Sequence, residues 1–260
     1  MVVVAARSPA LIAHVTRFHV HAESATDAHV SFAADEAHHL GRVLRLGPGD
    51  IVQAVDGHGH ELTVRLTAVD ALGARGLVLS RTARPTESPL DLTLVQGIVK
   101  GDKLEGIIRM ATELGVCRVV PVVTERTIAR AAPARWPHRL ERWRRVAKEA
   151  AKQSGRAVIP DVEPPRPLPE WLALRPQGLV VCFWEGATDS PDAILPAGGV
   201  DRASVIVGPE GGFSEGEVTR LRAAGSLVAG LGPRILRADT AGPVALALLQ
   251  SRYGDLGARA

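Results

Sequence analysis

The sequence lacks the features of a metal-binding, disulfide-bonded or membrane-spanning protein. Its two cysteines, Cys117 and Cys182, stand 65 residues apart with no CxxC spacing, which argues against a thiolate metal site or a disulfide framework and predicts two buried thiols in a reducing cytosol. No apolar run approaches the roughly 18 residues that a membrane span needs. The apolar start, MVVVAA, is interrupted by Arg7 and Pro9. We therefore predict that residues 1–13 are a disordered extension and that the protein is soluble and cytoplasmic.

Lysine is also scarce, with four residues against 27 arginines, and the formal net charge is only +3. Arginine binds phosphate bidentately and stacks on bases, so this balance suits an RNA partner, although a bias in genomic base composition would produce the same excess. Eight of the nine histidines precede residue 61. Because neither cysteine nor an acidic cluster stands beside them, no metal site is predicted.

The chain divides into two regions of different pattern. In the first, residues 14–84, short runs of alternating apolar residues are separated by glycine-rich turns; the runs are 51–55, 62–66 and 77–79, and the turns are GPGD at 47–50 and DGHG at 56–59. One short helix is predicted over 35–44, where Ala37, Leu40 and Leu44 have helical spacing. This pattern predicts a small β-barrel-like module, and the polar, proline-containing segment TARPTESP at 82–89 predicts a linker.

The second region, residues 88–254, alternates strands with helices. The predicted strands are 92–99, 116–123, 178–183, 203–207 and 226–231, and the predicted helices include 102–114, 138–153 and 240–253. Gly115 follows the first helix at the position of a left-handed cap. Three tryptophans, Trp136, Trp143 and Trp171, are predicted to pack in the core. Strands separated by helices predict a mainly parallel sheet covered on both faces, with a site beyond the carboxyl ends of its strands.

The most informative segment is VIVGPEGGFSEGEV at 205–218, in which a strand runs into a glycine-rich turn and then a helix. Its glycines permit positive φ and close approach of the backbone to a ligand. Ser214 and Glu217 have the S-x-x-E spacing of a capping box, which fixes the helix start. The segment has neither GxGxxG nor a GKS/GKT ending, which argues against a dinucleotide fold and a P-loop.

A second irregular loop follows in LGPRILRADTAGPVALALLQ at 231–250. Its apolar residues could wall a pocket for a flat ring such as adenine, with backbone amides as polar contacts. Asp239 or Thr240 is predicted to cap the last helix, and Pro243 is predicted to fall in its first turn. Capping explains Asp239, but it does not explain the two arginines of GPRILR.

These two loops resemble those of the RsmE family of 16S rRNA uridine-N3 methyltransferases. Further blocks resemble the same family in the same order: HHLGRVLRLGPGD at 38–50, KGDKLEGIIRMATELGV at 100–116, ERT at 125–127 and EAAKQSGRAVIP at 149–160. The resemblance spans roughly residues 17–249.

The resemblance implies an α/β fold of the SPOUT class at 88–254, with a mainly parallel sheet and a deep C-terminal trefoil knot, preceded by an RNA-binding PUA-like β-barrel at 14–84. It implies a homodimer that uses S-adenosylmethionine and no metal. The substrate implied is N3 of a uridine in 16S rRNA, within the assembled small ribosomal subunit. The implied cofactor-binding residues are Trp184, Glu185, Gly208, Pro209, Glu210, Gly211, Leu231, Gly232, Ile235 and Leu236.

Methylation at uridine N3 requires removal of a proton, because this nitrogen has no free lone pair. Glu210 is a candidate base, with structural hydrogen bonding to the knot as the alternative role. Arg237 is a candidate for charge stabilisation and phosphate contact. The family more often has glutamate at the position of Asp239, so we expect this shorter residue to cap the helix rather than to act in catalysis.

RNA contacts are expected from both regions. The basic residues that match the family blocks are Arg17, Arg42, Arg45, Lys100, Arg126 and Arg156. Each could instead be a solvated charge or a structural ion pair. Residues 141–152 would place four further cations on one face of a helix, which suits either RNA or plain solvent exposure.

Two other functions remain open at this stage. Another SPOUT enzyme would methylate a ribose 2′-oxygen or a tRNA base and would differ only at the acceptor pocket. A non-catalytic RNA-binding protein would keep the barrel and use the knotted domain as a scaffold. Binding of S-adenosylmethionine separates the second of these from an enzyme.

Overall fold

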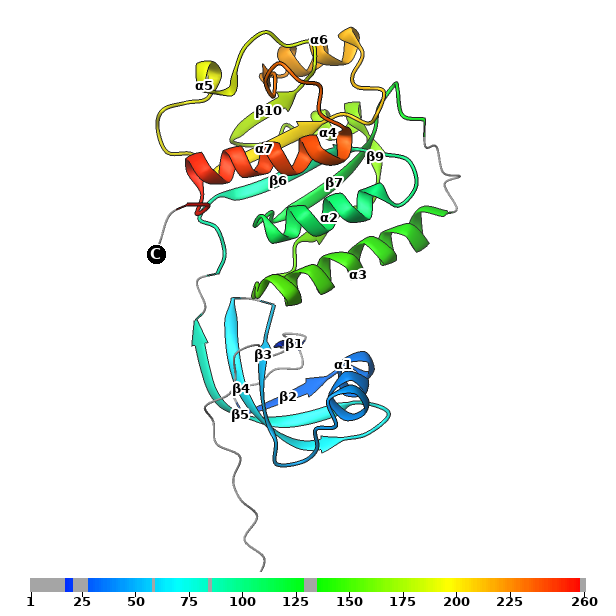
Figure 1. Ribbon diagram of the computed structural model, residues 1–260, viewed down its shortest axis with the longest axis vertical. Coiled ribbons are helices and arrows are strands. Elements are labelled where there is room, and N and C mark those ends of the chain that lie inside the picture. Colours follow the sequence, from blue (N-terminus) through cyan, green and yellow to red (C-terminus); the bar gives the residue numbers. More distant parts are fainter. Residues whose placement is uncertain (1–16, 21–27, 58, 84–85, 129–134, 258–260) are drawn as a thin grey trace, which may run out of the picture. The chain divides into compact units, whose positions relative to one another are not determined.

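A computed structural model describes residues 17–20, 28–57, 59–83, 86–128 and 135–257. The chain forms two compact units that divide between Thr86 and Glu87 (Figure 1). The predicted extension, residues 1–13, lies outside the described residues. No helix in the described part of the chain is long and apolar enough to cross a membrane.

The first unit is a five-stranded sheet with a short helical segment. Its strands lie in the order β1-β3-β4-β5-β2, and β1 pairs parallel with β3 while the other pairs are antiparallel. Their bounds are β1 (Arg17–His19), β2 (His29–Phe32), β3 (Ile51–Val55), β4 (His60–Val69) and β5 (Ala74–Ala83). The predicted linker therefore begins too early, since residues 82 and 83 still pair within β5.

The helical segment of the first unit differs from a plain helix over 35–44. It consists of α1 (Ala34–His38) followed directly by a π-helical turn, η2 (His39–Val43). Ala37 and Leu40 are buried in the core, but Leu44 is 40% exposed. A π-turn places more residues in each turn than an α-helix does, so Leu44 no longer lies on the face that its spacing predicts.

The second unit is a parallel sheet in the order β12-β10-β11-β6-β7-β8, with β9 also paired to β7. Its strands are β6 (Asp91–Gly97), β7 (Arg118–Val123), β8 (Asp161–Val162), β9 (Arg166–Pro167), β10 (Leu179–Phe183), β11 (Arg202–Val207) and β12 (Leu227–Ala229). Its helices are α2 (Lys103–Glu113), α3 (Trp136–Ser154), α4 (Leu168–Ala173), α5 (Pro191–Ile194), α6 (Glu215–Ala223) and α7 (Ala238–Tyr253). The predicted α/β alternation is confirmed.

Two apolar cores lie on opposite faces of this sheet, as a period of two in each strand requires. Val181 of β10 packs in the core under α2, α3 and α7, whereas its neighbour Cys182 packs in the core with α4 and α6. Figure 1 shows α7 and α2 side by side on one face of the sheet. Burial raises the pKa of the Cys182 thiol to about 12, so it stays protonated. Cys117, predicted to be buried, is only half-buried.

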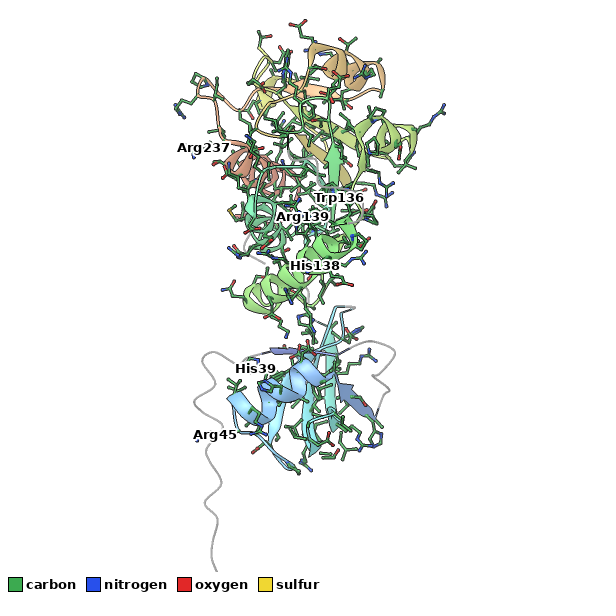
Figure 2. The ribbon with its side chains drawn as sticks, turned by 90° about the vertical axis from the view of Figure 1, so that its right-hand side faces the viewer. His39, Arg45, Trp136, His138, Arg139 and Arg237 are labelled. Atoms are coloured by element: carbon green, nitrogen blue, oxygen red, sulfur yellow. The ribbon has the colours of Figure 1, made fainter. Side chains whose placement is uncertain are left out.

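Local signals set several helix ends as predicted. Leu104, Ile107 and Ile108 bury one face of α2, and the helix ends before Gly115, whose φ of +79° makes it the expected left-handed cap. Trp143 and Trp171 are buried, and Trp136 packs against the core edge. The guanidinium of Arg139 lies over the rings of Trp136 and Trp143, and Figure 2 labels Arg139 and Trp136 on α3.

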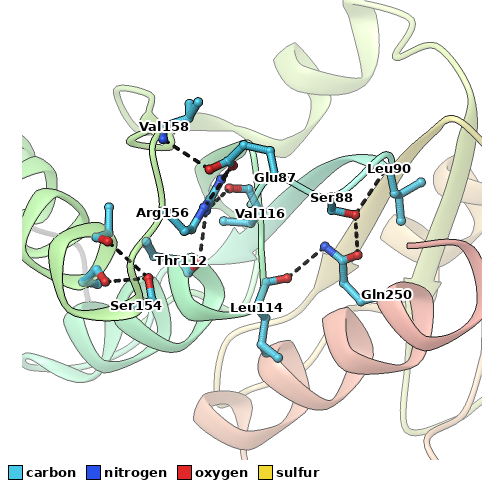
Figure 3. A network of polar contacts seen from close by, with 12 residues as sticks. Glu87, Ser88, Leu90, Thr112, Leu114, Val116, Ser154, Arg156, Val158 and Gln250 are labelled. Carbon is cyan, nitrogen blue, oxygen red and sulfur yellow. Dashed lines mark hydrogen bonds and ion pairs between the residues drawn. The ribbon is translucent and has the colours of Figure 1, made fainter. Parts of the chain in front are cut away.

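Buried polar contacts tie the first segment of the second unit to elements far along the chain (Figure 3). Ser88 donates from Oγ to Oε1 of Gln250 at 2.7 Å, and Nε2 of Gln250 donates to the carbonyl of Leu114 at 2.9 Å. Gln250 lies in α7 and is 1% exposed. These bonds fasten the end of α7 to the strand entry and to the end of α2.

Candidate functional site

The connections that leave three neighbouring strands meet at one edge of the sheet. Because β12, β10 and β11 are adjacent and parallel, the loops after their carboxyl ends gather on the same side. They enclose a cavity of about 490 Å³, which is within the size range of small-molecule sites. Its lining comes from Lys103, Phe183, Trp184, Glu185, Val207, Gly208, Pro209, Glu210, Gly212, Gly230, Leu231, Gly232, Pro233, Arg234, Ile235, Leu236, Arg237, Ala238 and Ala241.

The first wall is the GPEGG turn after β11. Its position is set by close backbone contact with the end of β6, since a Cβ placed on Gly97 would lie 2.4 Å from the nitrogen of Pro209. The predicted capping box is confirmed. Ser214 Oγ accepts from the Glu217 amide at 3.1 Å, and Glu217 Oε2 accepts from the Ser214 amide at 2.9 Å. Helix α6 therefore starts at a fixed point, and the turn is held between two rigid elements.

Glu210 is committed to contacts within the protein. Its Oε1 accepts from the backbone amide of Lys100 at 3.0 Å and from Nζ of Lys103 at 3.3 Å. Burial opposes ionisation of this carboxyl, but the hydrogen bonds from Lys100, from its own amide and from Lys103 outweigh burial and hold the pKa below its ordinary value. The alternative prediction for Glu210, a structural hydrogen-bonding role, therefore fits its placement better than proton abstraction does, and the partners of its side chain are Lys100, just before α2, and Lys103, at the start of α2.

A second layer supports the GPEGG turn from outside the cavity. Arg126 donates from Nη1 to the carbonyl of Gly211 at 3.2 Å. Glu125 accepts from Ser214 Oγ at 2.6 Å and from Arg220, and these contacts lower the pKa of the Glu125 carboxyl. Gly211 faces this layer, which explains why it does not line the cavity although it was predicted to bind the cofactor.

The second wall follows β10. Trp184 is half-buried, and the chain can pass close to its ring only because residue 186 is glycine, whose added Cβ would lie 2.6 Å from two ring atoms. Glu185 is exposed into the cavity. Its Oε1 lies so near the GPEGG turn that a Cβ on Gly212 would approach it to 2.2 Å. The φ of Gly212 is +67°, so glycine satisfies both the backbone conformation and the space here.

The third wall is the loop from Leu231 to Arg237. Leu231 and Leu236 are half-buried, while Ile235 is 85% exposed at the rim of the cavity. Figure 2 shows Arg237 at the surface of the second unit. Arg234 and Arg237 both line the cavity, and neither makes an ion pair within the described part of the chain.

The start of α7 corrects two predictions. The cap is Arg237, whose carbonyl accepts from the amides of Thr240 and Ala241, so Asp239 lies within the first turn instead of capping it. Pro243 lies inside the helix and not in its first turn. The helix begins two residues earlier than predicted because the backbone alone caps it, without the side-chain hydrogen bond that a sequence pattern would reveal.

The predicted RNA-binding residues have different environments. Arg42 and Arg45 are exposed on the first unit, and Lys100 and Arg126 are exposed on the second. The side chain of Arg17 lies outside the described residues.

Arg156 is a correction, because it is 4% exposed and cannot reach a phosphate. Its guanidinium pairs with Glu87 at 2.5 Å and donates to the carbonyls of Thr112 and Val116 at 3.0 and 2.8 Å (Figure 3). Its role is to hold Glu87, the first residue of the second unit, against the end of α2.

Sequence reasoning placed nine of its ten cofactor residues on this cavity and missed others. Lys103 and Arg234 are the most important omissions. Lys103 stands three residues after Lys100 in the KGDK block, and Arg234 is one of the two arginines that capping left unexplained. Among the described residues no three His, Cys, Asp or Glu side chains gather as metal ligands.

Comparisons with known proteins agree along most of the chain. A family model described as an RNA methyltransferase domain matches residues 86–250, and one described as an RNA methyltransferase PUA domain matches residues 32–76. The chain is 34% identical over 229 residues to the ribosomal RNA small subunit methyltransferase E of Bacillus subtilis, covering 84% of this chain and 88% of that protein.

Two solved structures are similar over almost their full length. The crystal structure of a ribosomal RNA small subunit methyltransferase E from Neisseria gonorrhoeae, bound to S-adenosyl methionine, is 33% identical with a TM-score of 0.82, covering 93% of this chain and 99% of that one. A Legionella pneumophila protein in complex with the cofactor SAM is 28% identical with a TM-score of 0.84, covering 94% and 100% of the two chains.

Proposed function

This chain belongs to the ribosomal RNA small subunit methyltransferase E family, and we propose that it transfers a methyl group from S-adenosylmethionine to N3 of a uridine in 16S rRNA. The single observation that carries the proposal is the meeting of three loops, after β10, β11 and β12, in one cavity of about 490 Å³. Two similar structures are described as containing the same cofactor.

The lining suits S-adenosylmethionine. Apolar side chains such as Leu231 and Leu236 offer a surface for the adenine ring, and the backbone of the two glycine-bearing loops offers polar contacts to its edge. Bound S-adenosylmethionine supplies an activated methyl group. The cations of Arg234 and Arg237 would meet the carboxylate of the cofactor and the phosphates of the RNA. Of the two predicted catalytic residues, Glu210 and Arg237, this proposal keeps Arg237 alone, because the carboxylate of Glu210 is already hydrogen-bonded to Lys100 and Lys103.

The same proposal extends to the fold of the first unit and to the path of the C-terminal chain. The first unit would close into a PUA-like barrel that contacts RNA through exposed cations such as Arg42 and Arg45. The segment from β12 to α7, which returns from the sheet edge to pack on β11 and β6, would thread the trefoil knot.

The exposed Ile235 and Leu248 would be covered in a homodimer, because large apolar side chains gain free energy when they leave water. The substrate would be the assembled small subunit, in the cytoplasm.

Two measurements test the function. Calorimetric titration with S-adenosylhomocysteine is expected to show one site per chain, and a protein without affinity would contradict the cofactor assignment. Small subunits from a strain that lacks the gene are then incubated with protein and S-adenosylmethionine, and the RNA is reverse-transcribed. Because a methyl group at N3 blocks the pairing edge, we expect one new stop in 16S rRNA. Stops in tRNA, or no stop, would refute the proposed substrate.

A further inference from the structure

Very few groups on the cavity wall could accept a proton. The titratable side chains that line it are Lys103, Glu185, Glu210, Arg234 and Arg237. An arginine keeps its proton at any physiological pH, and the ammonium of Lys103 is paired with Glu210. No histidine, cysteine, tyrosine or aspartate belongs to this lining. Among the described residues, a proton leaving a substrate in the cavity therefore has two carboxylates, Glu185 and Glu210, as possible destinations.

The two carboxylates differ in what already surrounds them. Glu210 accepts hydrogen bonds from Lys100 and Lys103, and these contacts favour its ionised form and make it a weaker base. Protonation of Glu210 would also weaken the link between the GPEGG turn and the start of α2. Its present contacts suit a residue that positions the turn.

The carboxylate of Glu185 has no comparable contacts. Within the described part of the chain, no hydrogen bond or ion pair to its side chain is formed, so the lone pairs of both carboxylate oxygens are available. Its position is nevertheless defined, because the carboxylate lies against the backbone of Gly212 and faces the cavity that Trp184 borders. An uncommitted carboxylate held at the wall of a ligand cavity is what a general base requires.

We propose that Glu185 is the general base that accepts the N3 proton of the target uridine. This inference rests on the proposed function, N3 methylation. The N3–H bond breaks and its proton passes to a carboxylate oxygen of Glu185. The electron pair left on N3 forms the new bond to the methyl carbon, and the pair of the broken carbon–sulfur bond stays on sulfur. The products are N3-methyluridine, S-adenosylhomocysteine and a protonated Glu185, which then returns its proton to water.

The competing role for Glu185 is to bind the positive groups of the cofactor. The two roles predict different behaviour of the variant Glu185→Gln, which keeps the shape of the side chain and removes its charge and basicity. A base is needed in the reaction but not for binding the cofactor, whereas a cofactor ligand is needed for both. Measuring affinity separately from the methylation rate distinguishes them.

The experiment compares wild type, Glu185→Gln, Glu185→Asp and the matched control Asp189→Asn, which changes an exposed carboxylate of the same loop that does not line the cavity. S-adenosylmethionine affinity and thermal stability are measured for each, followed by kcat on small subunits across pH. We expect Glu185→Gln to lose about 10²- to 10⁴-fold in kcat, with unchanged affinity and without the fall in rate on the acid side that wild type shows. Glu185→Asp should retain that acid limb at a reduced rate.

Three outcomes would overturn the proposal. They are a Glu185→Gln rate close to wild type, a loss of cofactor affinity equal to the loss of rate, and an acid limb that persists in this variant. Inactive wild-type protein with intact cofactor binding would refute the proposed function instead. A loss of folding in Glu185→Gln would show in its thermal stability, and the rate and acid limb of Glu185→Asp would then decide the question.

Discussion

The buried guanidinium of Arg156 permits a quantitative prediction. Replacement by methionine removes both bonds to Glu87 and leaves the carbonyls of Thr112 and Val116 without their shared donor. Glu87 would keep only the amide of Val158, at 3.2 Å. Breaking one partner out of a buried ion pair costs about 3–5 kcal/mol. Because the side chain of Glu87 is 24% exposed, water compensates part of this loss, and we expect about 3 kcal/mol.

Chemical and thermal unfolding measure this effect. For a domain of 150–250 residues each 1 kcal/mol lowers Tm by about 2–4 °C, so Arg156→Met should lower it by about 6–12 °C. The control is Arg145→Met, an exposed position on α3, which should change stability by less than about 0.5 kcal/mol. The double variant with Glu87→Gln should lose less stability than the sum of the losses in the two single variants, because the Glu87 carboxylate that Arg156→Met leaves unpaired is then absent. An Arg156→Met protein that keeps the wild-type Tm and loses RNA affinity would refute this reasoning. It would instead support the original prediction that Arg156 contacts an RNA phosphate.

Four further predictions follow from the contacts described above. Gln250→Leu removes the bridge between Ser88 and Leu114 and should destabilise the second unit by about 1–3 kcal/mol, measured by urea unfolding; an unchanged midpoint would contradict the role of that bridge. Glu210→Gln should change the pH dependence of stability. The folded-state pKa of Glu210 lies below its ordinary value of 4.5, so its stabilising effect is complete above that pH and disappears as pH falls through the folded value. In urea unfolding at several pH values, wild type should therefore be more stable than Glu210→Gln near neutral pH, and this difference in the free energy of unfolding should disappear in acid. Gly212→Ala places a methyl group against Glu185 and forces alanine to a φ of +67°, at a cost of about 1–3 kcal/mol, and should weaken S-adenosylhomocysteine binding in calorimetry. Asp239→Asn should keep most of its methylation rate because Asp239 does not line the cavity, and an inactive variant that folds and binds the cofactor would show this reasoning to be wrong.

Much of the fold could be predicted from local sequence signals. The capping box at Ser214 and Glu217 and the glycine cap at Gly115 are satisfied within a few residues of chain, so spacing alone reveals them. The cavity was predictable for a related reason. Once the strands are known to be parallel and adjacent, the loops at their carboxyl ends must meet.

The features that the sequence did not reveal depend on contacts between distant residues. Arg156 matches a basic block and looks like a surface cation, and only its contact with Glu87, 69 residues away, shows it to be buried. Lys103 reaches the cavity because Glu210, 107 residues later, holds it there. The start of α7 was missed because no side chain caps it. Spacing cannot report interactions of this range.

The bond between Ser88 and Gln250 has a consequence for biosynthesis. Its two partners are 162 residues apart, and at translation speeds of 5–20 residues per second they are made roughly 8 to 30 s apart. Strand β6, which begins three residues after Ser88, waits a comparable time for its neighbour β11. The nascent methyltransferase unit therefore emerges with one side of β6 unpaired, and this exposed strand edge must be kept from aggregating until β11 has been translated.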